Sequence, residues 1–176
     1  MSIRKAVLSD AAALSDLASV TFSLACPPHT AIEAIADFIS KNFQVTHFEG
    51  YLADPGRVLF VAEEGDEAIG YAMLILGEPT NADVIAAITR HPSCELSKLY
   101  VRPGHHGGGV SVALVAAAVD SARAAGRAGM WLGVNEENER ANAFYEKSGF
   151  ARVGVKKFLV GERWEDDFVR ERPLYR

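Results

Sequence analysis

The sequence is poor in cysteine, with only Cys26 and Cys94 among its 176 residues. Its first five residues are followed by Asp10 and Asp16 rather than by an apolar stretch, so the sequence predicts no signal peptide. Few, widely separated cysteines without a secretion signal are typical of free thiols in a reducing compartment. We therefore expect a cytoplasmic protein.

Long apolar runs and an excess of positive charge are also missing. No run approaches the roughly 18 residues that cross a bilayer, so no membrane span is expected. The net charge is −5, whereas binding of nucleic acid needs clustered lysine and arginine, so no nucleic-acid partner is expected. The chain also lacks internal repeats and low-complexity linkers. With 49% hydrophobic and 23% charged residues, it is predicted to form one globular domain over residues 1–176.

Helical and strand patterns alternate along the chain. Ser9 is the expected N-cap of a first helix, and Thr30 with Glu33 forms an expected capping box for a second. The segment 77–93 is predicted to be a long surface connection with a weakly helical middle, of a kind that is often functional. Strands are expected at 3–7, 58–62, 68–76, 94–101, 130–134, 153–160 and 167–172, and further helices at 45–52, 109–125 and 137–147. This order predicts an α/β or α+β fold with a mixed sheet.

Three successive glycines, Gly107, Gly108 and Gly109, stand between a predicted strand and the clearest predicted helix. Without Cβ atoms, the backbone can approach a bulky anion closely. The first N–H groups of a helix have no partner within it, and the helix dipole is positive there, so the run can bind phosphate oxygens. A flexible turn before a helix is the alternative. The run is not a Walker A loop, because no lysine follows the last glycine.

A second segment, 131–150, contains an apolar strand, a polar turn, a helix and a glycine stop. Asn138 stands near the helix start, where its amide can cap the helix or bind a ligand. Tyr145 follows two turns later on the same side of the helix. It is either a core tyrosine with its hydroxyl at the edge or a functional side chain.

Together the two segments resemble the GNAT superfamily of acetyl-CoA-dependent N-acetyltransferases. The family's cofactor motif, Gln/Arg-x-x-Gly-x-Gly/Ala preceded by Val-x-Pro, is similar to the run that begins at Val101-Arg102-Pro103. The family's second motif, Asn-x-x-Ala-x-x-x-Tyr-x-x-x-Gly-Phe, is matched at every fixed position by Asn138, Ala141, Tyr145, Gly149 and Phe150. The resemblance implies a mixed, mostly antiparallel sheet of six to seven strands flanked by helices, with acetyl-CoA as cosubstrate.

The resemblance also implies which residues bind the cofactor: Leu99, Tyr100, Val101, His106, Gly107, Gly108, Gly109, Val110, Ser111, Val112 and Asn138. Two positions depart from the family pattern. His106 replaces the usual Gln or Arg, and Ser111 replaces a common glycine. Neither change removes a backbone N–H, so pyrophosphate binding is expected to persist, although the affinity and the loop shape are open.

For catalysis, the resemblance makes Tyr145 the general acid that protonates the leaving thiolate. Glu95 begins the strand whose backbone N–H is expected to polarise the acetyl carbonyl. It is the candidate base that deprotonates the amine, directly or through water. A solvated charge at the strand end is the alternative for Glu95. Strand parity predicts one face with Glu95, Ser97, Leu99 and Val101 and another with Leu96, Lys98 and Tyr100.

The acceptor is expected to be a small-molecule amine. The strings 95–101, 131–134 and 158–167 look like the PaiA-type branch, for which polyamines are the proposed acceptors. An acidic wall would suit a polycation, and the N-terminal region offers four acids that are either this wall or solvated helix faces: Glu33, Asp37, Glu49 and Asp54.

Several alternatives stay open. The acceptor is otherwise a protein or peptide amine, or the chain is a CoA-binding regulatory module without catalysis. No metal is expected, because the histidines other than the His105-His106 pair are scattered, at His29, His47 and His91, and no ligand spacing is present. Monomer and homodimer are equally compatible with the sequence.

Overall fold

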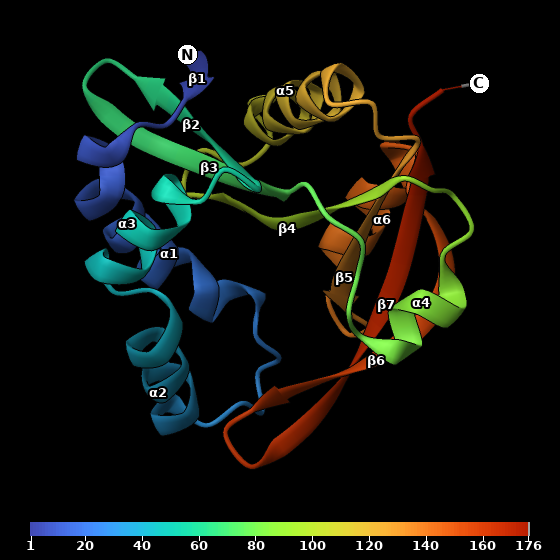
Figure 1. Cartoon of the computed structure of the whole chain (residues 1–176). Helices are drawn as coiled ribbons and strands as arrows, with labels where there is room; N and C mark the ends of the chain where they lie inside the picture. The colour runs from blue at the N-terminus through green and yellow to red at the C-terminus, as the bar shows by residue number, and fades with distance from the viewer. Residues whose placement is uncertain (176) are drawn as a thin grey trace.

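The computed structural model describes residues 1–175, which form one seven-stranded sheet in the order β1-β2-β3-β4-β5-β7-β6 (Figure 1). The β4–β5 pair is parallel, and the other five neighbouring pairs are antiparallel. The mostly antiparallel sheet expected from the family resemblance is thereby confirmed. The strands are β1 Ser2–Lys5, β2 Arg57–Glu64, β3 Glu67–Ile75, β4 Ser93–Val101, β5 Gly129–Asn135, β6 Ala151–Val160 and β7 Arg163–Pro173.

Helices cover both faces of the sheet, because alternate strand residues point to opposite faces. On β3, Ala72 packs into the core beneath α5 and α6, whereas Tyr71 and Met73 pack into the core beneath α1 and α3. A smaller cluster with Trp131 lies beneath α4. The helices are η1 Leu8–Asp10, α1 Ala11–Ala25, α2 Ile32–Asn42, α3 Val45–Ala53, α4 Ala82–Ala87, α5 Val110–Ala124 and α6 Glu139–Lys147.

The first two helices begin later than their sequence signals predict. Ser9 lies inside a 3-10 turn, and Asp10 is the N-cap of α1, while its carboxylate accepts the Val7 N–H across that turn and pairs with Arg4. The predicted capping box at Thr30 is also wrong. Ala31 is the N-cap of α2, and the buried Thr30 hydroxyl has no hydrogen-bond partner within residues 1–175.

A β-bulge in β4 overturns the predicted parity of this strand. Met73 pairs with Lys98 and Leu74 with Leu96, so one extra residue, Ser97, lies between them. Such an insertion moves the following side chains to the opposite face. Leu96 and Leu99 therefore share the core beneath α5, while Lys98 and Tyr100 face α1 and α3.

The connection between β3 and β4 is firmly attached to the sheet. It contains α4, which lies near the predicted weakly helical middle. The buried Glu171 carboxylate accepts the N–H groups of Thr89 and Arg90, and Glu78 accepts the Ser93 N–H. These contacts give the connection a structural role. Within the described chain, no helix is long and apolar enough to cross a membrane.

Candidate active site

A large cleft opens where β4 and β5 separate. The two strands pair from Ser93 to Glu95 on β4, and beyond Glu95 no strand within residues 1–175 pairs with the edge of β4 that faces β5. The cleft has a volume of about 980 Å³. It is lined by every predicted site residue except Gly108, namely Glu95, Leu99, Tyr100, Val101, His106, Gly107, Gly109, Val110, Ser111, Val112, Asn138 and Tyr145.

The glycine loop turns the chain from β4 into α5. Gly107 and Gly109 adopt left-handed backbone conformations, with φ of +85° and +81°, which a side chain would strain. Gly109 is the N-cap of α5 and has no side chain to occupy the first helical N–H groups. At the base of the loop, Arg102 donates its backbone N–H to Ile69 and pairs with Glu67 and Asp16. The helix N-terminus is therefore open toward the cleft.

His106 lies at the end of the cleft that the glycine loop forms. Arg140 lines the cleft as well, although the sequence motifs did not predict it as a site residue. Burial lowers the pKa of His106, and the nearby positive charge of Arg140 lowers it further. A neutral His106 therefore adds little positive charge, whereas Arg140 brings a permanent cation from α6. Arg140, which is distant in sequence, thus places a cation near His106, the position where the family usually has Gln or Arg.

Helix α6 brings Asn138 and Tyr145 to the cleft. The Asn138 side-chain oxygen accepts the Ala141 N–H, so Asn138 is the N-cap, one of its two predicted roles. Buried Arg170 attaches the helix to β7 by donating to the Asn142 side chain and to the Phe150 carbonyl, each at 2.9 Å. Burial raises the pKa of the Tyr145 phenol above its usual 10.0, so the phenol keeps its proton at neutral pH.

Glu95 and Lys98 face the cleft from β4. Burial raises the pKa of the Glu95 carboxyl above 4.5, and the charges of nearby Lys156 and Lys98 oppose part of this rise. Burial likewise lowers the pKa of Lys98 to about 8, although Glu95 partly opposes the shift. The Lys98 ammonium lies 4.7 Å from the centre of the Phe43 ring. Both groups thus lie in a poorly solvated part of the cleft.

An aromatic cluster forms the wall opposite the strands. Phe22 stacks on Phe38 with ring centres 4.6 Å apart, and Phe38 meets Phe43 and Phe158 edge-on. Cys26 also lines the cleft, and burial raises the pKa of its thiol to about 11, so the thiol stays protonated at neutral pH. These residues come from α1, α2 and β6, and no motif linked them in the sequence.

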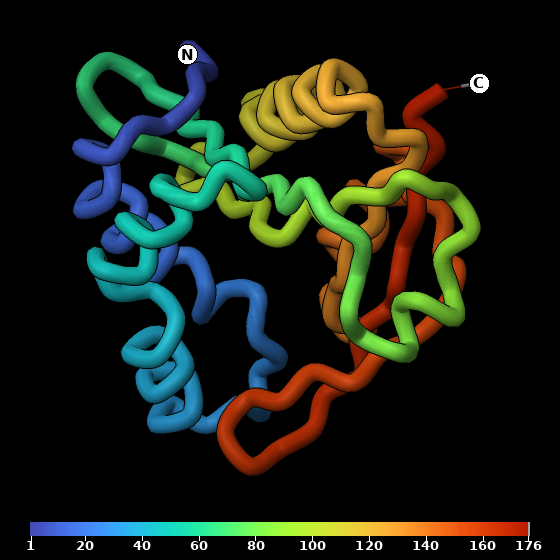
Figure 2. The backbone as a smooth tube through the Cα atoms, in the orientation of Figure 1, coloured from blue at the N-terminus to red at the C-terminus, as the bar shows by residue number. Residues whose placement is uncertain are grey.

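The β6–β7 hairpin closes the far end of the cleft. Its turn reaches α2 (Figure 2). A Cβ on Gly161 of this turn would lie 2.8 Å from the Ala34 side chain. His29, in the connection between α1 and α2, also contacts this hairpin. Its Nε2 lies 2.8 Å from Glu165 of β7, and its Nδ1 lies 3.6 Å from Glu137. Because its two nitrogens face different carboxylates, His29 links β7 to the turn that precedes α6.

The predicted acidic wall is not part of the cleft. Glu33, Asp37, Glu49 and Asp54 are all exposed and absent from its lining. Asp37 pairs with Lys41, and Asp54 pairs with Arg57. These acids are solvated helix faces, which was the other interpretation of the sequence.

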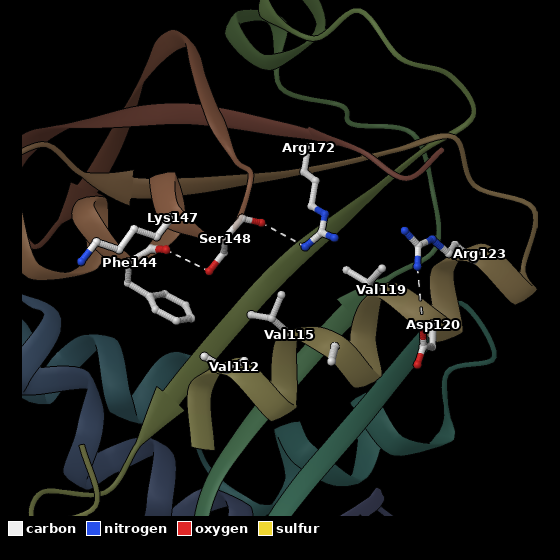
Figure 3. Close-up of a pocket in the computed structure, with 10 residues that line it drawn as sticks. Val112, Val115, Val119, Asp120, Arg123, Phe144, Lys147, Ser148 and Arg172 are labelled. Carbon is white, nitrogen blue, oxygen red and sulfur yellow. Dashed lines mark hydrogen bonds and ion pairs between the residues drawn. The ribbon is translucent and has the colours of Figure 1, made fainter. Parts of the chain in front are cut away.

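A second, smaller groove of about 400 Å³ runs between α5 and α6 (Figure 3). Val112 and Phe144 line both this groove and the main cleft. Arg123 and Arg172 lie at its far end. Arg123 donates a hydrogen bond to the Leu174 carbonyl, and Arg172 donates one to the Ser148 carbonyl. The groove is therefore a side branch of the main cleft and holds neither predicted catalytic residue.

The family model described as "Acetyltransferase (GNAT) family" matches residues 18–150, which include the glycine loop and α6. The chain belongs to the GNAT acetyltransferase family. This GNAT protein is therefore an acetyltransferase with acetyl-CoA as its cosubstrate, as the sequence motifs predicted.

Relatives and solved structures agree with this assignment. The chain is 41% identical to an uncharacterized N-acetyltransferase of Mycobacterium tuberculosis over 95% of its own length and 99% of the relative's. Its fold is similar to that of the PaiA N-acetyltransferase of Thermoplasma acidophilum, solved with coenzyme A, with a TM-score of 0.76, 20% identity and 98% coverage of both chains. It is also similar to that of the YncA protein of Salmonella typhimurium, solved with its cofactor acetyl-CoA, with a TM-score of 0.69, 22% identity and coverage of 100% of this chain and 95% of the other.

Proposed function

We propose that this GNAT protein acetylates a primary amine of a small molecule by direct attack in a ternary complex. The observation that carries the proposal is the shared cleft, onto which the glycine loop, Glu95 and Tyr145 all open. A cleft that holds both substrates converts a bimolecular reaction into an effectively unimolecular one. Its acceptor half is enclosed by α1, α2 and the β6–β7 hairpin, which suits a small molecule.

In this proposal, the glycine loop and the start of α5 bind the pyrophosphate through backbone N–H groups. His106, Ser111, Val112 and Asn138 flank the bound cofactor. The free edge of β4 from Leu99 to Val101 pairs with the pantetheine arm, and one of its N–H groups polarises the acetyl carbonyl. The separation of β4 from β5 supports this role, because it leaves backbone groups of β4 without a strand partner.

The amine nitrogen attacks the thioester carbonyl, and the carbon–sulfur bond breaks as the carbonyl re-forms. Glu95 accepts a proton from the nitrogen, and Tyr145 gives its proton to the departing thiolate. The proton lost by nitrogen thus balances the proton gained by sulfur. The raised pKa of Glu95 makes it a stronger base than an exposed glutamate, and the raised pKa of Tyr145 keeps its proton available.

An assay of thiol release from acetyl-CoA tests the proposal, with polyamines, amino acids, aminoglycosides and peptides as acceptors. Polyamines belong in this panel because of the PaiA-type resemblance. We expect release well above hydrolysis with at least one small amine, and a product heavier by one acetyl group. Release with peptides alone would support a protein acetyltransferase. Binding of CoA without transfer to any acceptor would support the regulatory module and overturn the proposal.

A further inference from the structure

The acceptor half of the cleft contains charges of both signs, which a site for a polycation does not require. Three acids and two lysines line it: Glu95, Glu165, Asp167, Lys98 and Lys156. Their partners show which of them are available to a substrate.

Three of the five charges are already paired. The Lys156 ammonium lies 3.3 Å from the Asp167 carboxylate. Glu165 lies 2.8 Å from His29 and 3.4 Å from Arg163. A substrate group would have to compete with these contacts.

Glu95 and Lys98 are the two that remain. Across residues 1–175, neither side chain has an ion-pair or hydrogen-bond partner, and the Lys98 ammonium lies over the ring face of Phe43, 4.7 Å from its centre. An ammonium without a direct ion-pair partner in a poorly solvated site is costly, and an anion in contact with it relieves this cost. A second substrate cation there would add repulsion instead.

The two unpaired groups are close enough for one small molecule to contact both. The charge of Lys98 lowers the pKa of Glu95, and the charge of Glu95 raises the pKa of Lys98. Three residues of a strand span at most about 10 Å. The aromatic cluster of Phe22, Phe38, Phe43 and Phe158 lies beside Lys98, since Phe43 belongs to it.

We infer that Lys98 is an anion-binding residue of the acceptor pocket and that the acceptor is a primary amine bearing a carboxylate and an apolar side chain. The inference rests on the proposed function. Glu95 faces the amine, Lys98 binds the carboxylate, and the aromatic cluster packs against the apolar part. Phenylalanine and its uncharged amide form a matched pair of probes for this arrangement.

The test compares kcat/KM for phenylalanine, phenylalaninamide and spermidine. We expect wild-type protein to prefer phenylalanine over the amide at least tenfold. The amine of the amide loses its proton more readily, so amine basicity cannot produce this preference. In Lys98→Met the ratio of the two kcat/KM values should fall at least tenfold, while Lys98→Arg should keep it. Lys41→Met, which changes an exposed lysine on α2, is the matched control and should leave the ratio and the activity unchanged.

Calorimetric binding of the same probes to the CoA-bound protein gives a readout that does not depend on turnover. Tighter binding of phenylalanine than of its amide, lost in Lys98→Met, supports the anion-binding role of Lys98 even if no acceptor is acetylated, in which case the proposed function fails and Lys98 binds a ligand rather than an acceptor. Equal use or equal binding of acid and amide by wild-type protein overturns it. Efficient acetylation of spermidine with no response to Lys98→Met also overturns it, and leaves the proposed function intact.

Discussion

At the scale of single residues, Tyr145 is the side chain whose chemical role can be tested most directly. Its phenol lines the cleft, and Tyr145→Phe removes the hydroxyl while keeping the ring that meets Phe144 and Phe150. A general acid typically contributes 10² to 10⁴ in rate. We therefore expect kcat to fall about 100-fold or more in single-turnover experiments, with the affinity for acetyl-CoA almost unchanged.

Tyr175→Phe is the matched control, because Tyr175 is exposed and donates to the Arg123 carbonyl outside the cleft. It should retain wild-type kcat. If Tyr145→Phe turns over at the wild-type rate when chemistry limits turnover, Tyr145 is not the acid.

The pH dependence of the reaction tests Glu95. A general base works in its deprotonated form, so kcat/KM should be lost as the pH falls through the pKa of Glu95. Because burial raises that pKa, the midpoint of this acid limb should lie above 4.5. Glu95→Gln should remove the limb and lower kcat about 100-fold. Glu49→Gln on exposed α3 is the control, and an acid limb that persists in Glu95→Gln would show that another group is the base.

At the scale of elements, the glycine loop offers a comparison within three successive residues. Gly107 and Gly109 have left-handed φ values, whereas Gly108 does not, and a Cβ on Gly108 would lie an ordinary 3.7 Å from the His105 carbonyl. Alanine in a left-handed conformation costs about 1–2 kcal/mol. We expect Gly107→Ala and Gly109→Ala to raise KM for acetyl-CoA about tenfold, and Gly108→Ala to change it less than twofold. Equal effects at all three positions would contradict a role for this loop shape.

The elements also show what local sequence patterns can and cannot predict. The β2–β3 hairpin and α5 follow from apolar alternation, polar turn residues and glycine stops, all of which act over a few neighbouring residues. The bulge at Ser97 was missed, although two successive polar residues, Ser97 and Lys98, interrupt the alternation between Leu96 and Leu99. The start of α1 was misplaced by one residue, because a 3-10 turn over Leu8–Asp10 precedes the helix and includes Ser9.

The candidate site divides in the same way. Motifs located the glycine loop and α6, since each is contiguous in the chain. The acceptor pocket was not predicted, because Lys98, Lys156 and the aromatic cluster come from separate elements that only the fold brings together. Arg140 is a further example from the cofactor end of the cleft. It lies two residues beyond Asn138 within the predicted motif, but only the fold brings its charge close to His106.

At the scale of the whole molecule, the cleft separates two parts of the sheet that share only a short contact. β4 with β1–β3 lies on one side and β5 with β6 and β7 on the other, and β4 pairs with β5 at just three positions. A cofactor bound between them adds contacts that the unfolded chain lacks. At 100 times Kd such binding stabilises a protein by about 2.7 kcal/mol. For a chain of this size, each kcal/mol raises Tm by about 2–4 °C, so saturating acetyl-CoA should raise Tm by about 5–10 °C.

Hydrogen exchange identifies where this stabilisation acts. We expect acetyl-CoA to protect amides of β4 after Glu95 and of the first turn of α5, because the ligand covers both. Gly109→Ala should reduce the rise in Tm at a fixed acetyl-CoA concentration, whereas Gly108→Ala should preserve it, so that the two variants separate loss of the cofactor site from general destabilisation. Protection of the α5 turn without protection of β4 would place the cofactor at the helix end alone and exclude the strand edge from its binding. In that case the separation of β4 and β5 would serve the acceptor only, and the carbonyl would need a different donor.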